Sequence, residues 1–249
     1  MVSKVAVVTG SNQGIGFGIV KELCRRNVEI VYLTSRDEER GRKAVKSLEN
    51  SGFYPKFHQL DVTDETSVEV FADFIKEKHG GVDILINNAG FLDPDFYKTT
   101  YEDAKKVIDV NFYGIVLMQK YFFPILRDSV EDGTLKEEDF IENSVIAYRV
   151  SKVAVSALTR VQQKQVGRGI SINHLNPGFV RTNMTRGGGD MTVDEAGLTP
   201  AYLALDIDQS VKGKYFWFDK TEVDWADFTL NIVDTFEAFE KALDEVKNN

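Results

Sequence analysis

Tyr148 and Lys152 stand four residues apart in a stretch, residues 148–165, whose apolar spacing predicts a helix. Side chains at this spacing share one helix face. A phenol with an ordinary pKa of about 10 is a poor acid at neutral pH, but a nearby ammonium stabilises the phenolate and lowers that pKa. The pair therefore predicts a tyrosine that transfers a proton. Such pairs are also common on surface helices, so the prediction depends on the other motifs.

A glycine-rich turn at residues 9–16 follows a short β-branched run at residues 5–8. Its Thr-Gly-x3-Gly-x-Gly spacing lies between a predicted strand and a predicted helix. Glycines allow a tight turn and a close approach to phosphate, and a helix N-terminus offers free N–H groups to an anion. This context favours a dinucleotide pyrophosphate over a purely structural turn. The expected contacts are Gly10, Ser11, Asn12, Gln13, Gly14, Ile15 and Gly16.

The end of the second predicted strand reads Thr34-Ser35-Arg36, where a cofactor without a 2′-phosphate usually meets an acidic residue. A guanidinium pairs with phosphate through two hydrogen bonds, so Arg36 favours NADP(H). Arg40, one helical turn later, could add to this pocket. Asp37 is the alternative, because it could bind the ribose hydroxyls instead, and a solvated helix start would explain both arginines without a ligand.

Strand and helix patterns alternate over the first 86 residues, which predicts an α/β fold with a doubly wound, mostly parallel sheet between two helix layers. The predicted strands are residues 5–8, 29–33, 56–60 and 84–86, and the predicted helices are residues 15–26, 40–51 and 66–79.

The rhythm changes after residue 100. We expect a helix over residues 101–127, irregular near Asn111 and Gly114, and an acidic stretch at 128–143 without a clear strand. The helix at 148–165 is followed by a strand at 171–175, an edge strand at 213–218 and an extra C-terminal helix within 228–249. With a length near the upper end for one core, these elements predict a single domain over residues 1–249.

Composition excludes several classes of protein. The net charge of −9 argues against a general nucleic-acid binder. The sequence contains no run of about 20 apolar residues, so it predicts no membrane span. Cys24 is the only cysteine and no secretory leader is recognisable, so we expect a cytoplasmic protein. The three histidines lack metal-ligand spacing, so we expect no metal.

Five motifs in chain order resemble those of the short-chain dehydrogenase/reductase family. They are the turn at residues 9–16, Asn87-Asn88-Ala89-Gly90, Asn111, Tyr148-x3-Lys152 and Pro177-Gly178. Segments 33–37, 57–61 and 111–114 are most similar to NADPH-dependent carbonyl reductases. The resemblance implies a Rossmann-type fold and reduction of a small carbonyl substrate by hydride from the nicotinamide, in a monomer or a small homo-oligomer.

Individual roles also follow from this resemblance. Tyr148 would be the proton donor, Lys152 its activator and Asn111 the holder of a relay water. The implied cofactor contacts are Asp61 and Val62 at the adenine, Asn88, Ala89 and Gly90 beside the fourth strand, Tyr148 and Lys152 near the ribose, and Pro177, Gly178, Val180 and Thr182 at the nicotinamide.

One family element has no counterpart that we can identify. The family carries a strand between the Asn111 helix and the Tyr148 helix, and a serine at its end polarises the substrate carbonyl. Here residues 124–127 resemble the end of the preceding helix, and neither Ser129 nor Ser144 merits the serine's role. Residues 139–147 could replace the strand, the sheet could close differently, or the sequence could be a shortened version of a longer one.

Three functional hypotheses follow from this departure. The first is an active NADPH-dependent carbonyl reductase. The second is an NADP(H)-binding protein with little or no turnover, and the third is an unstable variant, because unpaired strand edges are costly. We expect segment 91–97, the region before Tyr148 and segment 179–197, which include several aromatic residues, to form a pocket for an apolar carbonyl compound.

Overall fold

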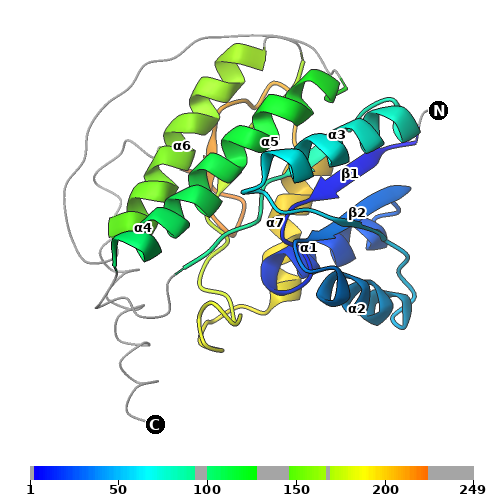
Figure 1. The fold of residues 1–249 in the computed structure, drawn as a ribbon, viewed down its shortest axis with the longest axis horizontal. Helices are drawn as coiled ribbons and strands as arrows, with labels where there is room; N and C mark the ends of the chain where they lie inside the picture. Colours follow the sequence, from blue (N-terminus) through cyan, green and yellow to red (C-terminus); the bar gives the residue numbers. More distant parts are fainter. Residues whose placement is uncertain (1–2, 93–99, 128–145, 167–168, 224–249) are drawn as a thin grey trace.

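A parallel four-stranded sheet organises the N-terminal part of the chain (Figure 1). The computed structural model describes residues 3–92, 100–127, 146–166 and 169–223, with the side chains of 146–150 and 153 left aside. The strand order is β3-β2-β1-β4, and Ala6 of β1 pairs with both Val31 and Ile84. The strands are β1 (Val5–Val8), β2 (Ile30–Ser35), β3 (Lys56–Gln59) and β4 (Ile84–Ile86).

Helices cover both faces of this sheet, which confirms the predicted three-layer arrangement (Figure 1). Alternate residues of β1 enter different cores: Val5 and Val7 pack with Phe71, whereas Ala6 and Val8 pack with Ile19. The first core is covered by α3 (Glu65–His79) and α5 (Gly114–Phe122), and the second by α1 (Gly14–Arg25), α2 (Glu38–Glu49) and α7 (Val193–Leu205). Burial on both faces explains the continuous apolar strands.

Helix α7 was not predicted, although its start carries a recognisable signal. Thr192 and Glu195 form a capping box, in which Thr192 Oγ1 accepts the Glu195 N–H and the Glu195 carboxylate accepts the Thr192 N–H. The helix crosses α1 at two glycines. A Cβ added to Gly197 would lie 2.7 Å from the backbone carbonyl of Gly18, so the two helices are in backbone contact.

The helix predicted at 101–127 is divided into several parts. It consists of α4 (Tyr101–Ile108), a π-helical turn η1 (Asp109–Tyr113), α5 and a short 3-10 turn η2 (Phe123–Ile125). The predicted irregularity near Asn111 is confirmed, but the predicted C-terminal end is wrong. Leu126 is extended and forms a parallel bridge with Val82, with the Arg127 N–H donating to the Val82 carbonyl at 2.9 Å. The chain therefore starts to pair beside β4 before it leaves the described residues.

A separate three-stranded sheet has the order β5-β6-β7. Its strands are β5 (His174–Leu175), β6 (Tyr215–Phe216) and β7 (Glu222–Val223), each of two residues. The strand predicted at 171–175 is thus shorter than expected. The strand predicted at 213–218 is not an edge strand, because the unpredicted β7 pairs with it on the far side from β5.

Among the described residues no strand joins β4 to β5, and residues 128–145, which lie between η2 and α6 in the chain, are outside the described residues. Helix α6 (Ile146–Val166) contains Ile146 and Ala147, so these two residues are helical and do not extend a replacement strand. Ser129, Ser144 and the helix predicted within 228–249 lie outside the described residues. Within the described part, no helix has the length and apolar character of a membrane span.

Candidate functional site

The glycine-rich turn between β1 and α1 has a geometry that requires its glycines. Gly10 and Gly14 have φ angles of +59° and +58°, a left-handed region that side chains disfavour. Gly16 is needed for space, because a Cβ there would lie 2.4 Å from Asn88 Nδ2 and 2.8 Å from the Cα of Ser11. All three predicted glycines therefore meet a physical requirement, and together they leave an open cradle of backbone.

Side chains on neighbouring strands hold this turn in place. Thr9 Oγ1 accepts the backbone N–H groups of Asn88 and Ala89 at 3.0 Å each, and Asn88 Nδ2 donates to the Thr9 carbonyl at 2.8 Å. Ser11 is fully buried, donates to the Val8 carbonyl at 2.7 Å and accepts the Thr34 N–H at 2.9 Å. The main-chain N–H groups of both residues are also used, by the Thr34 carbonyl for Ser11 and by Thr9 Oγ1 for Asn88, so these bonds hold the turn to the ends of β2 and β4.

The N-terminus of α1 differs from those of α2 and α3. Asp37 caps α2 by accepting the Arg40 N–H at 2.9 Å, and Asp64 caps α3 by accepting the Thr66 N–H at 3.0 Å. Gln13, at the start of α1, makes no capping bond through its side chain. The first N–H groups of α1 thus lack the side-chain acceptor found at the other two helices, which suits an anionic ligand at that end.

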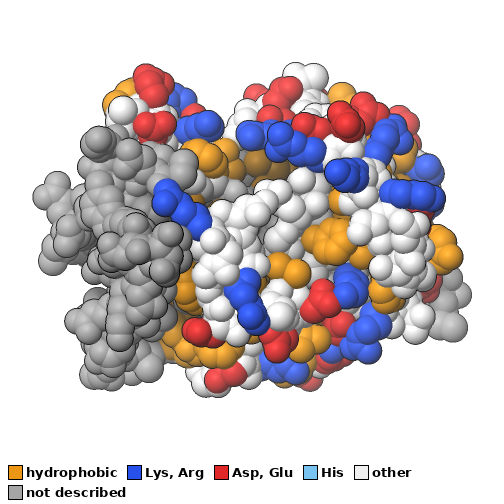
Figure 2. Space-filling view, turned by 90° about the horizontal axis from the view of Figure 1, so that it is seen from below, with side chains coloured by type: hydrophobic (Ala, Val, Ile, Leu, Met, Phe, Trp, Pro, Cys, Tyr) orange, Lys and Arg blue, Asp and Glu red, His pale blue; other side chains and the backbone are white. Residues whose placement is uncertain are grey.

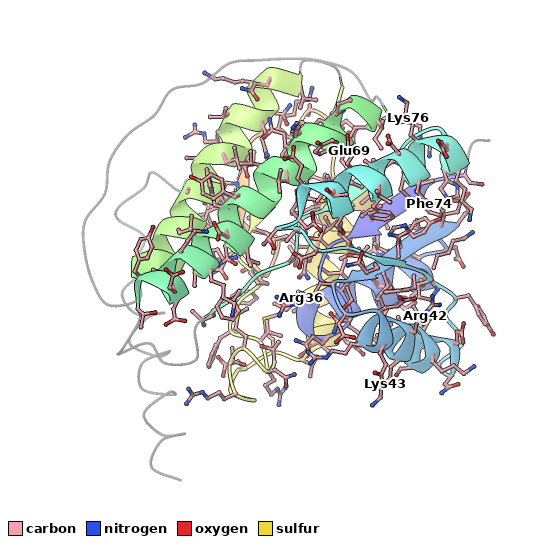
Figure 3. The ribbon with its side chains drawn as sticks, in the orientation of Figure 1. Arg36, Arg42, Lys43, Glu69, Phe74 and Lys76 are labelled. Carbon is pink, nitrogen blue, oxygen red and sulfur yellow. The ribbon has the colours of Figure 1, made fainter. Side chains whose placement is uncertain are left out.

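Arg36 is exposed and directly follows β2, and its carbonyl accepts a hydrogen bond from Gln59 Nε2 at the end of β3 (Figure 3). Within the described part of the chain it forms no salt bridge. Arg40 instead lies 3.2 Å from the carboxylate of Asp37, which also caps α2. Lys43 extends outward from α2 (Figure 3). Of the two predicted phosphate contacts, Arg40 is thus paired with Asp37, whereas Arg36 is in none of the described salt bridges, and both oxygens of Asp37 have partners.

The predicted adenine contacts have other local partners. One carboxylate oxygen of Asp61 accepts the Thr63 N–H and hydroxyl at 2.9 and 2.7 Å. Val62 is buried, and a Cβ added to Gly114 would lie 2.9 Å from its methyl group. This contact packs the segment after β3 against the first turn of α5.

Asn111 lies buried in the π-helical turn, a feature often found at functional sites. Its Oδ1 accepts the Phe91 N–H at 2.7 Å, and its Nδ2 donates to the Phe91 carbonyl at 2.9 Å and to Ser151 Oγ at 3.2 Å. Both amide hydrogens are used, so a water held by Asn111 would need the second lone pair of Oδ1 or the main-chain carbonyl.

Lys152 on α6 approaches the same place from the opposite side. A Cβ added to Gly90 would lie 3.6 Å from Asn111 Oδ1 and 3.9 Å from Lys152 Nζ, so the two predicted residues converge beside Gly90. Tyr148 precedes Lys152 by one turn of the same helix, and its side chain lies outside the described residues.

The segment after β5 lies next to the pyrophosphate turn. Gly178 has a φ angle of +79°, and its N–H donates to Asn176 Oδ1 at 2.9 Å. A Cβ added to Gly14 would lie 3.6 Å from the methyl group of Thr182, and Val180 is buried. Pro177 and Thr182 line the same cavity as Gly10 and Gly14. The residues predicted at the pyrophosphate and those predicted at the nicotinamide thus line one cavity.

This cavity has a volume of about 1420 Å³, larger than the roughly 300–1,000 Å³ of common ligand sites. It contains the cofactor cradle and Lys152, and it also extends between β4 and β5, where Leu85, Leu126 and Leu175 line it. The extra space lies where the sheet is interrupted. Phe91 lies beside the site through Asn111, whereas residues 93–97 of the predicted pocket lie outside the described residues.

Several buried polar atoms along this cavity have no hydrogen-bond partner within the described structure: Asn87 Oδ1, Arg127 Nε and both ring nitrogens of His174. The His174 ring stacks on Tyr215 with centroids 4.7 Å apart. Burial, aided by the charge of Arg160, lowers the pKa of His174 from 6.5 to about 4. Sequence analysis gave His174 no role, and only its position on a predicted strand could have suggested burial.

Acidic and basic side chains are interspersed over the described part of the face in Figure 2. Among the described residues no group of histidine, cysteine or carboxylate side chains is arranged to hold a metal ion.

Comparison with known proteins places this geometry in context. The chain is 33% identical to rat carbonyl reductase [NADPH] 3, over 82% of this chain and 91% of the relative. It is 32% identical to bovine carbonyl reductase [NADPH] 1, over 89% of this chain and 98% of the relative. The bovine alignment spans 272 positions, more than the 249 residues of this chain, so part of the relative has no counterpart here.

Solved structures show the same fold. Salutaridine reductase from Papaver somniferum superposes with a TM-score of 0.76 at 28% identity, covering 86% of this chain and 99% of that one. A short-chain dehydrogenase from Burkholderia cenocepacia in complex with NADP gives a TM-score of 0.72 at 25% identity, covering 86% of this chain and 96% of that one. The family model described as short chain dehydrogenase matches residues 4–192. The chain belongs to the short-chain dehydrogenase family.

Proposed function

We propose that this chain is an NADPH-dependent reductase that converts aldehydes or ketones to alcohols. The observation that carries the proposal is the convergence of Lys152 Nζ and Asn111 Oδ1 beside Gly90, in the cavity that also contains the pyrophosphate turn. The printed names of the relatives, carbonyl reductases that use NADPH, support the same cofactor and reaction.

The residues present fit an NADP(H) molecule. Three glycines leave a cradle that a Cβ would fill or strain, the N-terminus of α1 has no side-chain cap, and Arg36 is exposed at the end of β2. The cradle suits the pyrophosphate, and Arg36 suits the 2′-phosphate. The bound cofactor supplies the hydride that reaches the carbonyl carbon.

The chain's own residues would supply the proton and hold the reacting groups. Tyr148 donates its phenolic proton to the carbonyl oxygen, and the positive charge of Lys152 one turn away stabilises the phenolate that remains. Lys152 also binds the nicotinamide ribose. Asn111 fixes the backbone of Phe91 through two hydrogen bonds and so shapes the wall next to Gly90.

A second candidate is an NADP(H)-binding protein with little or no turnover. It is favoured by the interruption between β4 and β5, where unpartnered polar atoms of Asn87 and His174 line the cavity. The family places its carbonyl-polarising serine at the end of a strand in this part of the sheet. Cofactor binding depends on β1, α1 and β2, which the interruption leaves intact.

Two measurements on the same protein separate these candidates. NADPH affinity is measured by fluorescence, and turnover by loss of NADPH absorbance with a panel of aldehydes and ketones. We expect Tyr148→Phe to retain affinity and to lose about 100- to 10,000-fold in kcat, the usual range for a positioned general acid. Binding without turnover in the wild-type protein would favour the second candidate, and absence of binding would contradict both.

A thermal transition that is cooperative and rises with NADPH would exclude the hypothesis of an unstable variant. We also propose a cytoplasmic protein, a monomer or small homo-oligomer, that acts on a small apolar carbonyl compound. The half-buried Cys24, whose thiol pKa is raised by burial to about 11, would be a poor nucleophile and suits a packing role. Cell fractionation and light scattering test the compartment and the oligomeric state.

A further inference from the structure

Ser151 is fully buried on α6, immediately before Lys152 and three residues after Tyr148. Its hydroxyl oxygen accepts a hydrogen bond from Asn111 Nδ2 at 3.2 Å. The same Asn111 amide holds both the N–H and the carbonyl of Phe91. A continuous set of hydrogen bonds therefore runs from the helix that carries Tyr148 and Lys152, through the π-helical turn, to the segment after β4.

This connection lies where the two sides of the site meet. Gly90 precedes Phe91, and a Cβ on Gly90 would be within 4 Å of both Asn111 Oδ1 and Lys152 Nζ. A shift of α6 along its axis would change the distance from Lys152 to Gly90. The Ser151–Asn111 bond opposes that shift, because breaking it would leave a buried amide hydrogen without a partner.

Helix α6 is held by neighbouring helical elements. It contacts α4 and η1, and no strand between β4 and β5 is found in the part of the chain that the structure describes. The Ser151–Asn111 bond joins α6 to η1 directly, so it contributes to fixing the position of α6.

We propose that Ser151 is a positioning residue: through Asn111 it sets Lys152, and with it Tyr148, at the working distance from the cofactor site beside Gly90. The inference rests on the proposed reductase function. Ser151 itself contacts neither substrate nor cofactor in this scheme. Its effect on the reaction comes through the placement of Lys152, whose charge sets the pKa of the Tyr148 phenol.

The test compares Ser151→Ala with a matched control on the same helix, Ser156→Ala. The Ser156 hydroxyl bonds back to the Lys152 carbonyl at 3.1 Å within its own helix and makes no link to η1. For Ser151→Ala we expect kcat to fall about 10- to 100-fold, as for a misplacement of about 1 Å, with a smaller change in the KM for the carbonyl substrate. Ser156→Ala should leave both values within twofold of wild type.

The pH profile distinguishes positioning from simple destabilisation. If Lys152 moves away, the phenol pKa of Tyr148 rises, so the fall of kcat at alkaline pH should move to higher pH in Ser151→Ala and stay unchanged in Ser156→Ala. Ser151→Thr keeps the accepting oxygen and should restore much of the rate if its melting temperature matches wild type. A lower melting temperature with an unchanged kcat and pH profile would overturn the proposal.

A double-mutant cycle checks that Ser151 acts through Asn111. In an Asn111→Ala background, Ser151→Ala should cause no further loss of kcat, whereas independent effects would multiply and contradict the proposed link. If the wild-type protein shows no turnover, the proposed function fails separately. NADPH affinity then decides for Ser151: several-fold weaker binding in Ser151→Ala than in Ser156→Ala supports the placement of Lys152, and equal binding refutes it.

Discussion

The two sheets of this molecule differ in the length of their strands and in how fully they are packed. In the four-stranded sheet, strands of three to six residues pair in parallel between two buried cores. In the three-stranded sheet, each strand has two residues, and β5 pairs with a described strand on one side only. The cofactor cradle depends on the first sheet, whereas α6 and the segment after β5 flank the interruption. Cofactor binding therefore depends on the well-packed four-stranded sheet, whereas the proposed catalytic residues on α6 lie in the part with fewer strand contacts among the described residues.

Two half-buried histidines show the same contrast. His58, on β3, stacks on Phe71 at 4.2 Å, and one ring nitrogen lies 2.6 Å from the Gln59 carbonyl. His174, on β5, stacks on Tyr215, but both of its ring nitrogens lack a partner in the described structure. Within the described part of the chain, one ring nitrogen of His58 thus has a polar partner, whereas neither ring nitrogen of His174 has one. No described strand lies on the side of β5 away from β6, where such a partner could be placed.

The largest expected effect is in the cofactor cradle. Gly16→Val would push a side chain into Asn88 and the Ser11 backbone, which cannot move without breaking the turn. We expect NADPH to bind at least about 100-fold more weakly, which corresponds to about 2.7 kcal/mol. Fluorescence titration measures this, with Gly52→Ala as a control that strains a remote left-handed turn. Unchanged affinity in Gly16→Val would show that the first sheet does not form the binding region.

A smaller effect is expected at the end of β2. Removing the Arg36 guanidinium in Arg36→Ala should weaken NADPH binding about 10- to 100-fold, because a hydrogen bond to a charged group is worth about 1.5–3 kcal/mol. NADH affinity should not fall, since NADH has no 2′-phosphate. Arg40→Ala is the matched comparison, and an equal loss there would mean that Arg40 leaves Asp37 to bind the phosphate.

A substitution at the contact between α1 and α7 tests whether the four-stranded and three-stranded sheets unfold together. Gly197→Ala would force a methyl group to within 2.7 Å of the Gly18 backbone, at an expected cost of about 1–3 kcal/mol. We expect a lower midpoint in urea and a transition that separates into two steps, followed by the fluorescence of the two tryptophans, Trp217 and Trp225, and by far-UV circular dichroism. Leu198→Ala, at a largely exposed position of the same helix, should change the midpoint little.

His174 gives the three-stranded sheet a pH dependence. Its folded-state pKa of about 4 lies below the ordinary value of 6.5, so its stability contribution is complete above pH 6.5 and is lost as pH falls from 6.5 toward 4. His174→Phe keeps the ring stack and removes both unpaired nitrogens. We expect a gain of about 1–2 kcal/mol at pH 7 and a flatter profile between pH 7 and 5.

Urea unfolding at several pH values measures this effect. His58 and His79 also have lowered pKa values, chiefly through burial, so some acid sensitivity should remain in the variant. A His174→Phe protein that is less stable than wild type at pH 7 would show that the ring nitrogens have partners in solution.

The smallest expected effect is at the point where the chain leaves η2. Arg127 pairs with Asp83 at 2.7 Å and holds the extended residue Leu126 beside β4. Arg127→Met should cost about 1 kcal/mol by thermal unfolding, because the pair is only partly exposed. Arg42→Met, at the exposed pair with Glu38, should have no measurable effect. If Arg127→Met and Arg42→Met lower the stability equally, the Arg127–Asp83 pair contributes no more than an exposed surface pair.

The sequence predicted the first region well because its signals are local. β-branched runs, apolar helix spacing and glycines at fixed intervals identify β1 to β4 and the cradle, and even the irregularity at Asn111 was expected. The second region depends on pairing between short segments far apart in the chain. β6 pairs with β5 and β7, and two-residue strands leave too little periodicity to detect.

The candidate site divides in the same way. Motif spacing identified Lys152 and Asn111, and the structure brings them together beside Gly90. Motif spacing could not reveal that Ser151 Oγ accepts the second amide hydrogen of Asn111. A serine inside a helix is an ordinary residue until its buried partner is known. Nor could motif spacing reveal the unpaired nitrogens of His174, which depend on what lies beside β5.

The crossing of α1 and α7 has a consequence for the order in which the protein forms. The glycines in contact are residues 18 and 197, so the first helix of the cofactor cradle gains its packing partner only after most of the chain has been synthesised. Until then, the apolar face of α1 that receives Ala201 is uncovered in the nascent protein. Helix α1, complete in sequence by residue 25, thus depends for its full packing on a helix that is translated much later.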